Sequence, residues 1–218
     1  MSLQRKRPIE LFIIILCLSF CTYPGIGQKL KILPLGNSLT YDHCSLDPPI
    51  SQDKPNRRAY RARLYNQLNN AGYTFDFVGN EETGSNYLPY STIDSLDYTD
   101  NAGFPGMTTN ENSGLIEVLN FGWDPGNHSN CLVGGGCPRN YLEVYEPDII
   151  LLHIGTNDIS AAVPAQTIVN NIDSILNIVD AYETSSGKTV PVFLAQIINR
   201  AVTSCDPEDG ATTIFNNL

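Results

Sequence analysis

Short apolar runs alternate with longer segments of helical periodicity along most of this chain. Four runs predict buried strands because they are apolar, brief and bounded by glycine, proline or polar residues. They are 29–36, 73–79, 147–155 and 189–197. The third run, "PDIILLHIG", is almost continuously apolar, which is typical of a parallel strand buried on both faces of a sheet.

Two segments between these runs predict amphipathic helices, 56–72 and 164–182. In the first, the arginines are expected on a different face from the apolar stripe, which is Tyr60, Leu64, Leu68 and Ala71. Gly72 is a natural stop for that helix. In the second, Pro164 suits the first turn, and the predicted stripe is Ile168, Ile172, Ile175, Leu176 and Val179.

The order strand, helix, strand, repeated twice, predicts βαβ units and a parallel sheet between helical layers. We therefore expect an α/β protein with a three-layer α/β/α, flavodoxin-like fold. Residues 80–146 interrupt this rhythm, and only 113–121 looks helical within them. This stretch is interpreted as a loop-rich functional insertion.

The first 28 residues have the layout of a secretory signal peptide. Basic residues 5–7 precede an apolar stretch of 11 residues, Leu11–Cys21, and small residues follow it. That stretch is shorter than the roughly 20 residues of a membrane-spanning helix. The expected organisation is a signal peptide, 1–28, then one domain, 29–218, secreted and free of the membrane after cleavage. An uncleaved anchor is the alternative.

Cysteine usage agrees with export to an oxidising compartment, since four cysteines remain beyond the signal peptide. "CLVGGGC" predicts a disulfide that closes a tight loop between Cys131 and Cys137. Pairing of Cys44 with Cys205 would follow by elimination. A zinc site is the competing interpretation, but the spacing of cysteines and histidines is not the usual one, so no metal is predicted.

The net charge of -10 argues against a nucleic-acid partner, because no basic stripe is present to neutralise phosphates. The charge does not identify a substrate, and the sequence does not predict the oligomeric state. Residues 127–129, "NHS", form a glycosylation sequon at Asn127, which matters only in a eukaryotic source.

Three motifs follow or lie near predicted strand ends, where parallel sheets bind their ligands. The first motif is "GNSLT" (36–40), the second "AGFPGMTT" (102–109) and the third "GTND" (155–158). Each alone is commonplace, since Ser38 could cap a turn and Asp158 a helix. Together, in this order and spacing, they resemble the SGNH hydrolases, also called the GDSL family. The flanking sequences look most like secreted carbohydrate esterases of the acetylxylan-esterase kind.

This resemblance implies a serine esterase in which Ser38 is the nucleophile. The oxyanion formed in the reaction would be stabilised by the backbone N–H groups of Ser38 and Gly106 and by the side-chain amide of Asn157. Gly106 is expected to adopt a positive φ or to approach the substrate closely. Gly36, Asn37 (where aspartate is often found) and Asp158 would be supporting residues, with Asp158 holding its loop. No cofactor is implied.

The family places its catalytic base in a D-x-x-H sequence, which this chain lacks: no histidine follows Asp206 or Asp209. The histidines are His43, His128 and His153, and His153, within a predicted strand, is expected to be structural. Either the chain stops before a last strand and helix, or it is a silent relative. In both cases these 218 residues are expected to be weakly active or inactive.

The expected function is hydrolysis of O-acetyl or similar esters on polysaccharides. The alternatives are a lipid esterase or lysophospholipase of the same superfamily and a catalytically silent carbohydrate-binding relative. Polar and aromatic residues of the insertion could form a sugar-facing rim, although they could equally be ordinary loop residues: Tyr87, Tyr90, Tyr98, Asn101 and Asn110.

Overall fold

The computed structural model describes residues 29–41, 59–83, 99–124, 129–130 and 140–197. Its elements, in chain order, are β1 (Leu30–Gly36), α2 (Ser38–Tyr41), α3 (Ala59–Asn70), β2 (Phe75–Phe77), β3 (Glu81–Glu82), β4 (Asp100–Gly103), α5 (Leu115–Phe121), β5 (Trp123–Asp124), β6 (Ser129–Asn130), α6 (Tyr141–Tyr145), β7 (Ile149–His153), α7 (Thr156–Ser160), α8 (Ala165–Ser186) and β8 (Val192–Leu194).

The central sheet is mostly parallel, with strand order β3-β4-β1-β7-β8, and β2 also pairs with β1. The first half of β1, Leu30–Ile32, pairs with β2, whereas Leu35 and Gly36 pair with β4. On its other edge β1 pairs with β7 over five residues, and β7 pairs in turn with β8. Among the described strands of this sheet, β3 alone runs antiparallel to its neighbour, β4. Strands β5 and β6 form a separate antiparallel pair.

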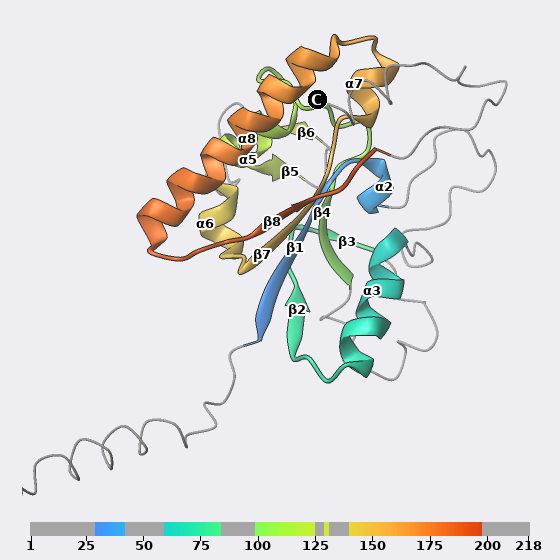
Figure 1. Ribbon diagram of the computed structural model, residues 1–218, viewed down its shortest axis with the longest axis vertical. Helices are drawn as coiled ribbons and strands as arrows, with labels where there is room; N and C mark the ends of the chain where they lie inside the picture. Colours follow the sequence, from blue (N-terminus) through green and yellow to red (C-terminus); the bar gives the residue numbers. More distant parts are fainter. Residues whose placement is uncertain (1–28, 42–58, 84–98, 125–128, 131–139, 198–218) are drawn as a thin grey trace, which may run out of the picture.

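Helices cover both faces of this sheet, with α3 on one side and α5, α6 and α8 on the other (Figure 1). The predicted α/β/α fold class is therefore confirmed. The predicted stripe of α8 is also confirmed, since Ile168, Ile172, Ile175 and Val179 are buried and Leu176 packs against the same core. Each such side chain contributes about 1.5 to 3 kcal/mol by leaving water.

Two sequence expectations differ from the structure. The face of α3 that is buried carries Arg61, Ala62 and Tyr65, so an arginine points inward and Tyr60 is 37% exposed. The arginines therefore do not share one solvent face, because Arg61 finds hydrogen-bond acceptors inside the protein. The stretch 80–146, expected to be loop-rich, also supplies β4, whose "DNAG" sequence has too little apolar character to predict a strand.

Candidate active site

The three motifs follow the ends of three adjacent strands. Gly36 of β1 pairs with Gly103 of β4 on one side and with His153 of β7 on the other. All three strands are parallel, so their carboxyl ends form one edge of the sheet. Ser38, Gly106 and Asn157 follow these paired residues by two, three and four positions. Figure 1 shows α2 and α7, which carry Ser38 and Asn157, at this same end of the sheet.

The first motif forms a tight turn that presents Ser38. Asn37 is 1% exposed, and its Oδ1 accepts a hydrogen bond from the Leu39 N–H at 3.0 Å, as an N-cap does. The Asn37 carbonyl also accepts from the N–H groups of Thr40 and Tyr41. Asn37 thus closes the turn around Ser38, whose side chain remains half-buried.

Two glycines let this turn lie directly against backbone. A Cβ at Gly36 would be 2.2 Å from the His153 carbonyl oxygen and 2.8 Å from Thr40 Oγ1. A Cβ at Gly103 would be 2.4 Å from the Tyr41 nitrogen. Because no real Cβ is accommodated at such distances, the absence of a side chain at Gly36 and Gly103 fixes how closely α2 packs on the strand ends.

The second motif is anchored at its start and opens at Gly106. The Phe104 N–H donates to the Gly36 carbonyl at 2.9 Å, and the Met107 N–H donates to the Phe104 carbonyl at 3.1 Å. The Phe104 ring packs on Trp123 with centroids 4.7 Å apart. Gly106 is exposed and has φ +80, with nothing within 4 Å of a Cβ built there. Two reasons for a glycine at 106 were predicted, a positive φ and a close approach to the substrate. The described residues show the first of these, the positive φ.

The third motif is bonded to the second. Asn157 Nδ2 donates to the Met107 carbonyl at 2.8 Å, so one N–H of its amide fixes the loop that carries Gly106. A side-chain amide has two N–H donors, and within the described ranges the second N–H of Asn157 has no hydrogen-bond acceptor. That half-buried donor is the part of the amide that could meet a ligand.

Asp158 also bonds to the loop of the second motif, at Thr109. It is 1% exposed, and its carboxylate accepts from the Thr109 N–H at 2.9 and 3.1 Å and from the Thr109 hydroxyl at 2.6 Å. Asn171 of α8 donates to Thr109 Oγ1 at 2.9 Å. The expected loop-holding contact of Asp158 is present, and Thr109 and Asn171 are partners that the motifs did not indicate.

A further group behind the strand ends was missed by sequence reasoning. Arg61 is 0% exposed, and its guanidinium bonds to the Thr40 carbonyl of α2 and to the Thr99 carbonyl before β4. Asn101, proposed above for a sugar-facing rim, is also 0% exposed and binds Glu81, Thr83 and Thr99. That assignment of Asn101 is wrong, because its amide is used up in joining β3 to β4.

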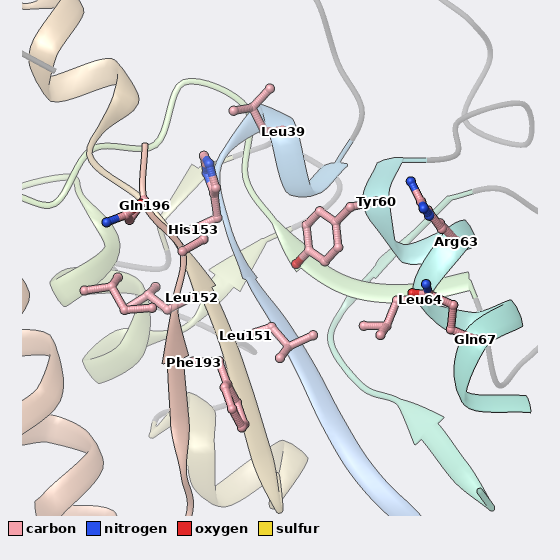
Figure 2. A pocket seen from close by; sticks show the side chains of 12 residues that line it. Leu39, Tyr60, Arg63, Leu64, Gln67, Leu151, Leu152, His153, Phe193 and Gln196 are labelled. Carbon is pink, nitrogen blue, oxygen red and sulfur yellow. The ribbon is translucent and has the colours of Figure 1, made fainter. Parts of the chain in front are cut away.

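His153 lies at the carboxyl end of β7, on the face of the sheet that α3 covers. Burial lowers the pKa of its imidazole from the ordinary value, which keeps the ring neutral at neutral pH. Its Nδ1 is buried, with no hydrogen-bond partner among the described residues. The ring lies at one end of an open hollow of about 680 Å³ between α3 and β8, whose lining includes Leu39, Leu151 and Phe193 (Figure 2).

Several predicted features lie outside the described residues. They are the signal peptide 1–28, Asn127, His43, His128, three tyrosines of the proposed rim (Tyr87, Tyr90 and Tyr98), and the four cysteines Cys44, Cys131, Cys137 and Cys205. Within the described ranges, no group of three or more His, Cys, Asp or Glu side chains could hold a metal ion. No helix among those ranges has the length and apolar character needed to cross a bilayer.

Comparison with known proteins finds an esterase of related sequence. No family model matches the chain. A multidomain esterase from Ruminococcus flavefaciens is 37% identical over 134 residues, which are 60% of this chain and 15% of that protein. The chain therefore spans less than a sixth of this curated relative.

Two solved structures share the fold. One is a carbohydrate esterase family 3 protein from Talaromyces cellulolyticus, and the other is an acetyl esterase with one serine changed to alanine, determined with an acetate ion. Each has a TM-score of 0.55 and 21% identity, over 86% of this chain and 69% of the other. The resemblance predicted from the motifs is thus confirmed for the fold, which is the α/β fold of the family 3 carbohydrate esterases.

Proposed function

We propose that this protein hydrolyses O-acetyl or similar esters on polysaccharides through an acyl-enzyme formed at Ser38. The observation that carries the proposal is the register of β4, β1 and β7, which puts Ser38, Gly106 and Asn157 after the same line of strand ends. The hydrogen bond between Asn157 and Met107 supports a single site, because it joins the second and third motifs directly.

In the proposed reaction, Ser38 Oγ attacks the ester carbonyl carbon while its proton passes to a base. The carbonyl oxygen becomes an oxyanion that accepts from the backbone N–H groups of Ser38 and Gly106 and from the second N–H of the Asn157 amide. Collapse breaks the bond to the sugar oxygen, which leaves with a proton. Water then attacks the acyl-serine and releases the carboxylic acid. Loss of one oxyanion donor typically costs about 3 to 4 kcal/mol in such reactions.

The substrate class follows from the relatives rather than from a described sugar site. A curated esterase matches in sequence, and the fold is that of family 3 carbohydrate esterases. Export by the predicted signal peptide fits a substrate outside the cell, so an extracellular location is part of the proposal. The base is expected in a D-x-x-H sequence that these residues do not contain, so slow turnover is also expected.

The test is hydrolysis of an activated acetate ester by the wild-type chain, Ser38→Ala and Ser174→Ala. Ser174 is the matched control, because its hydroxyl bonds to the Asn170 carbonyl on the exposed side of α8. We expect Ser38→Ala to lose the slow turnover that depends on the nucleophile and Ser174→Ala to keep the wild-type rate. A measurable wild-type turnover that Ser38→Ala retains in full would remove Ser38 from the mechanism.

The same proteins distinguish the alternatives. Faster release of acetate from acetylated xylan than of fatty acid from a long-chain ester supports the polysaccharide substrate, and the reverse order supports a lipid esterase. Binding of acetylated xylan with no turnover of any ester would support a silent carbohydrate-binding protein.

A further inference from the structure

Arg61 of α3 is a fully buried cation that does not belong to any of the three motifs. It is 0% exposed, and its side chain is among the largest that are fully buried within the described residues. Removing a guanidinium from water costs several kcal/mol, and this cost is recovered only where its donors meet well-placed acceptors. A buried arginine therefore need not add to folding stability. The positions of its acceptors indicate which segments it holds together.

Three acceptors of Arg61 lie in two segments, the α2 turn that carries Ser38 and the residues that flank β3 and β4. Nε donates to the Thr40 carbonyl at 3.2 Å, Nη1 donates to the Thr99 carbonyl at 3.3 Å, and Nη2 bonds to Thr83 Oγ1. Thr40 belongs to the α2 turn, two residues after Ser38. Thr83 directly follows β3, and Thr99 directly precedes β4.

Backbone hydrogen bonds that span Ser38 close the α2 turn. The Thr40 and Tyr41 N–H groups both donate to the Asn37 carbonyl, at 3.0 and 3.2 Å, so the turn is closed at both ends. A shift of the Thr40 carbonyl therefore displaces Ser38 as well. The bond from Arg61 reaches this turn from a helix that is 21 residues away in sequence.

Two more bonds of Arg61 reach residues beside β4, the strand that leads to Gly106. Asn101 Nδ2 donates to the same Thr99 carbonyl at 3.1 Å and to the same Thr83 hydroxyl at 3.2 Å. Asn101 Oδ1 accepts from the Gly103 N–H at 3.0 Å, at the end of β4. Arg61 thus shares its acceptors with the residue that fixes the last peptide of β4, three positions before Gly106.

The geometry points to Arg61 as a positioning residue that fixes the Ser38 turn relative to the β4 end carrying the Gly106 loop. This inference rests on the proposed function. A planar fork of five donors can serve acceptors in several directions, whereas lysine offers donors from one atom only. Arg61→Lys keeps the positive charge, so it removes the fork while preserving the buried cation.

Hydrogen–deuterium exchange tests this without relying on activity. In Arg61→Lys we expect faster amide exchange in 36–41 and in 101–107 together, with exchange in α8 (165–186) unchanged. Arg63→Lys is the matched control, because Arg63 is exposed on the same helix, and it should match wild type. Uniformly faster exchange in all three segments, or in none, would overturn a positioning role.

Kinetics supply the second readout. A misplacement of about 1 Å can cost roughly 100-fold in rate, so we expect Arg61→Lys to lower kcat on an activated acetate ester by about 10- to 100-fold, with KM within about twofold. An unchanged kcat alongside an inactive Ser38→Ala would refute the role of Arg61 only. An active Ser38→Ala would refute the proposed function, while the exchange result would still decide the coupling of the two segments.

Thr83→Val covers the case in which Arg61→Lys does not fold. Valine is nearly isosteric with threonine but removes the hydroxyl shared by Arg61 and Asn101. We expect the same two segments to exchange faster in Thr83→Val and kcat to fall by a smaller factor. Wild-type exchange in both segments would then overturn the inference.

Discussion

The buried pair of Asp158 and Thr109 gives the sharpest energetic prediction. The perturbation is a double-mutant cycle of Asp158→Asn and Thr109→Val. Asp158 is 1% exposed and Thr109 is 0% exposed, and their side chains meet at 2.6 Å. Asparagine retains one acceptor for the Thr109 N–H, and valine retains the volume of threonine, so neither change opens a large cavity.

The expected magnitude follows from the bonds that each change removes. A hydrogen bond to a charged group contributes about 1.5 to 3 kcal/mol, compared with about 0.5 to 1.5 kcal/mol for a neutral pair. Thr109→Val removes one charged bond and leaves the Asn171 donor without its threonine acceptor, so we expect a loss of about 2 to 3 kcal/mol. The coupling energy between the two changes should be about 1 to 2 kcal/mol.

The assay is urea unfolding of the four proteins of the cycle, followed by circular dichroism. The matched control is the cycle of Asp180→Asn and Thr184→Val on the exposed face of α8. There the threonine hydroxyl bonds to the backbone carbonyl of the aspartate at 2.9 Å, not to its carboxylate. A coupling energy for the buried pair no larger than that of the control would refute the reasoning.

Two further predictions concern Asp100 and Gly36. Burial, with the nearby carboxylates of Glu82 and Asp76, raises the pKa of Asp100 from 3.8 to about 6. The folded state then binds more protons between about pH 4 and 6, so stability falls as pH rises through this window. Asp100→Asn should remove this loss of unfolding free energy, which is about 1 to 2 kcal/mol after allowance for solvent at this half-buried group. The measurement is the urea midpoint of each protein at pH 4 and at pH 7. Gly36→Ala puts a Cβ 2.2 Å from the His153 carbonyl oxygen and should destabilise by about 3 kcal/mol or more in the same unfolding assay.

Each of these two predictions has a control within the chain. Asp173→Asn removes a carboxylate from the exposed face of α8 and reports the effect of net charge alone. An equal change in pH dependence for Asp173→Asn and Asp100→Asn would contradict the local explanation. Gly187→Ala meets nothing within 4 Å and adds only the strain of φ +70, about 1 kcal/mol. If Gly36→Ala loses no more unfolding free energy than Gly187→Ala, the strand ends can move apart to accommodate a Cβ, and the close-packing argument is wrong.

Apolar periodicity was sufficient to predict the frame of the fold. The strands β1 and β7 and the helix α8 bury continuous or regularly spaced apolar side chains, and these patterns are visible in the sequence. The strand β4 was not predictable in this way. Its Asn101 is buried because Glu81, Thr83 and Thr99 satisfy the amide, and such partners are set by tertiary structure.

The candidate site also has a part that was predictable from the sequence and a part that was not. The resemblance of the three motifs to the SGNH hydrolases predicted Ser38, Gly106 and Asn157 as a group, and the strands that these residues follow are neighbours in the sheet. The arginines were predicted on a different helix face from the apolar stripe, since helical periodicity treats every arginine as polar and cannot foresee acceptors from distant segments. The bond from Asn157 to Met107 spans 50 positions, so only the folded chain reveals it.

The way in which β3 and β4 pair has a consequence for changes in chain length. Glu82 lies opposite Asp100, so both ends of the intervening chain are pinned beside each other at the sheet margin. Doubling the length of a connection whose ends are already pinned costs only about 0.6 kcal/mol in closure entropy. Insertions and deletions between these two strand ends should therefore cost little stability while the strand ends keep their alignment.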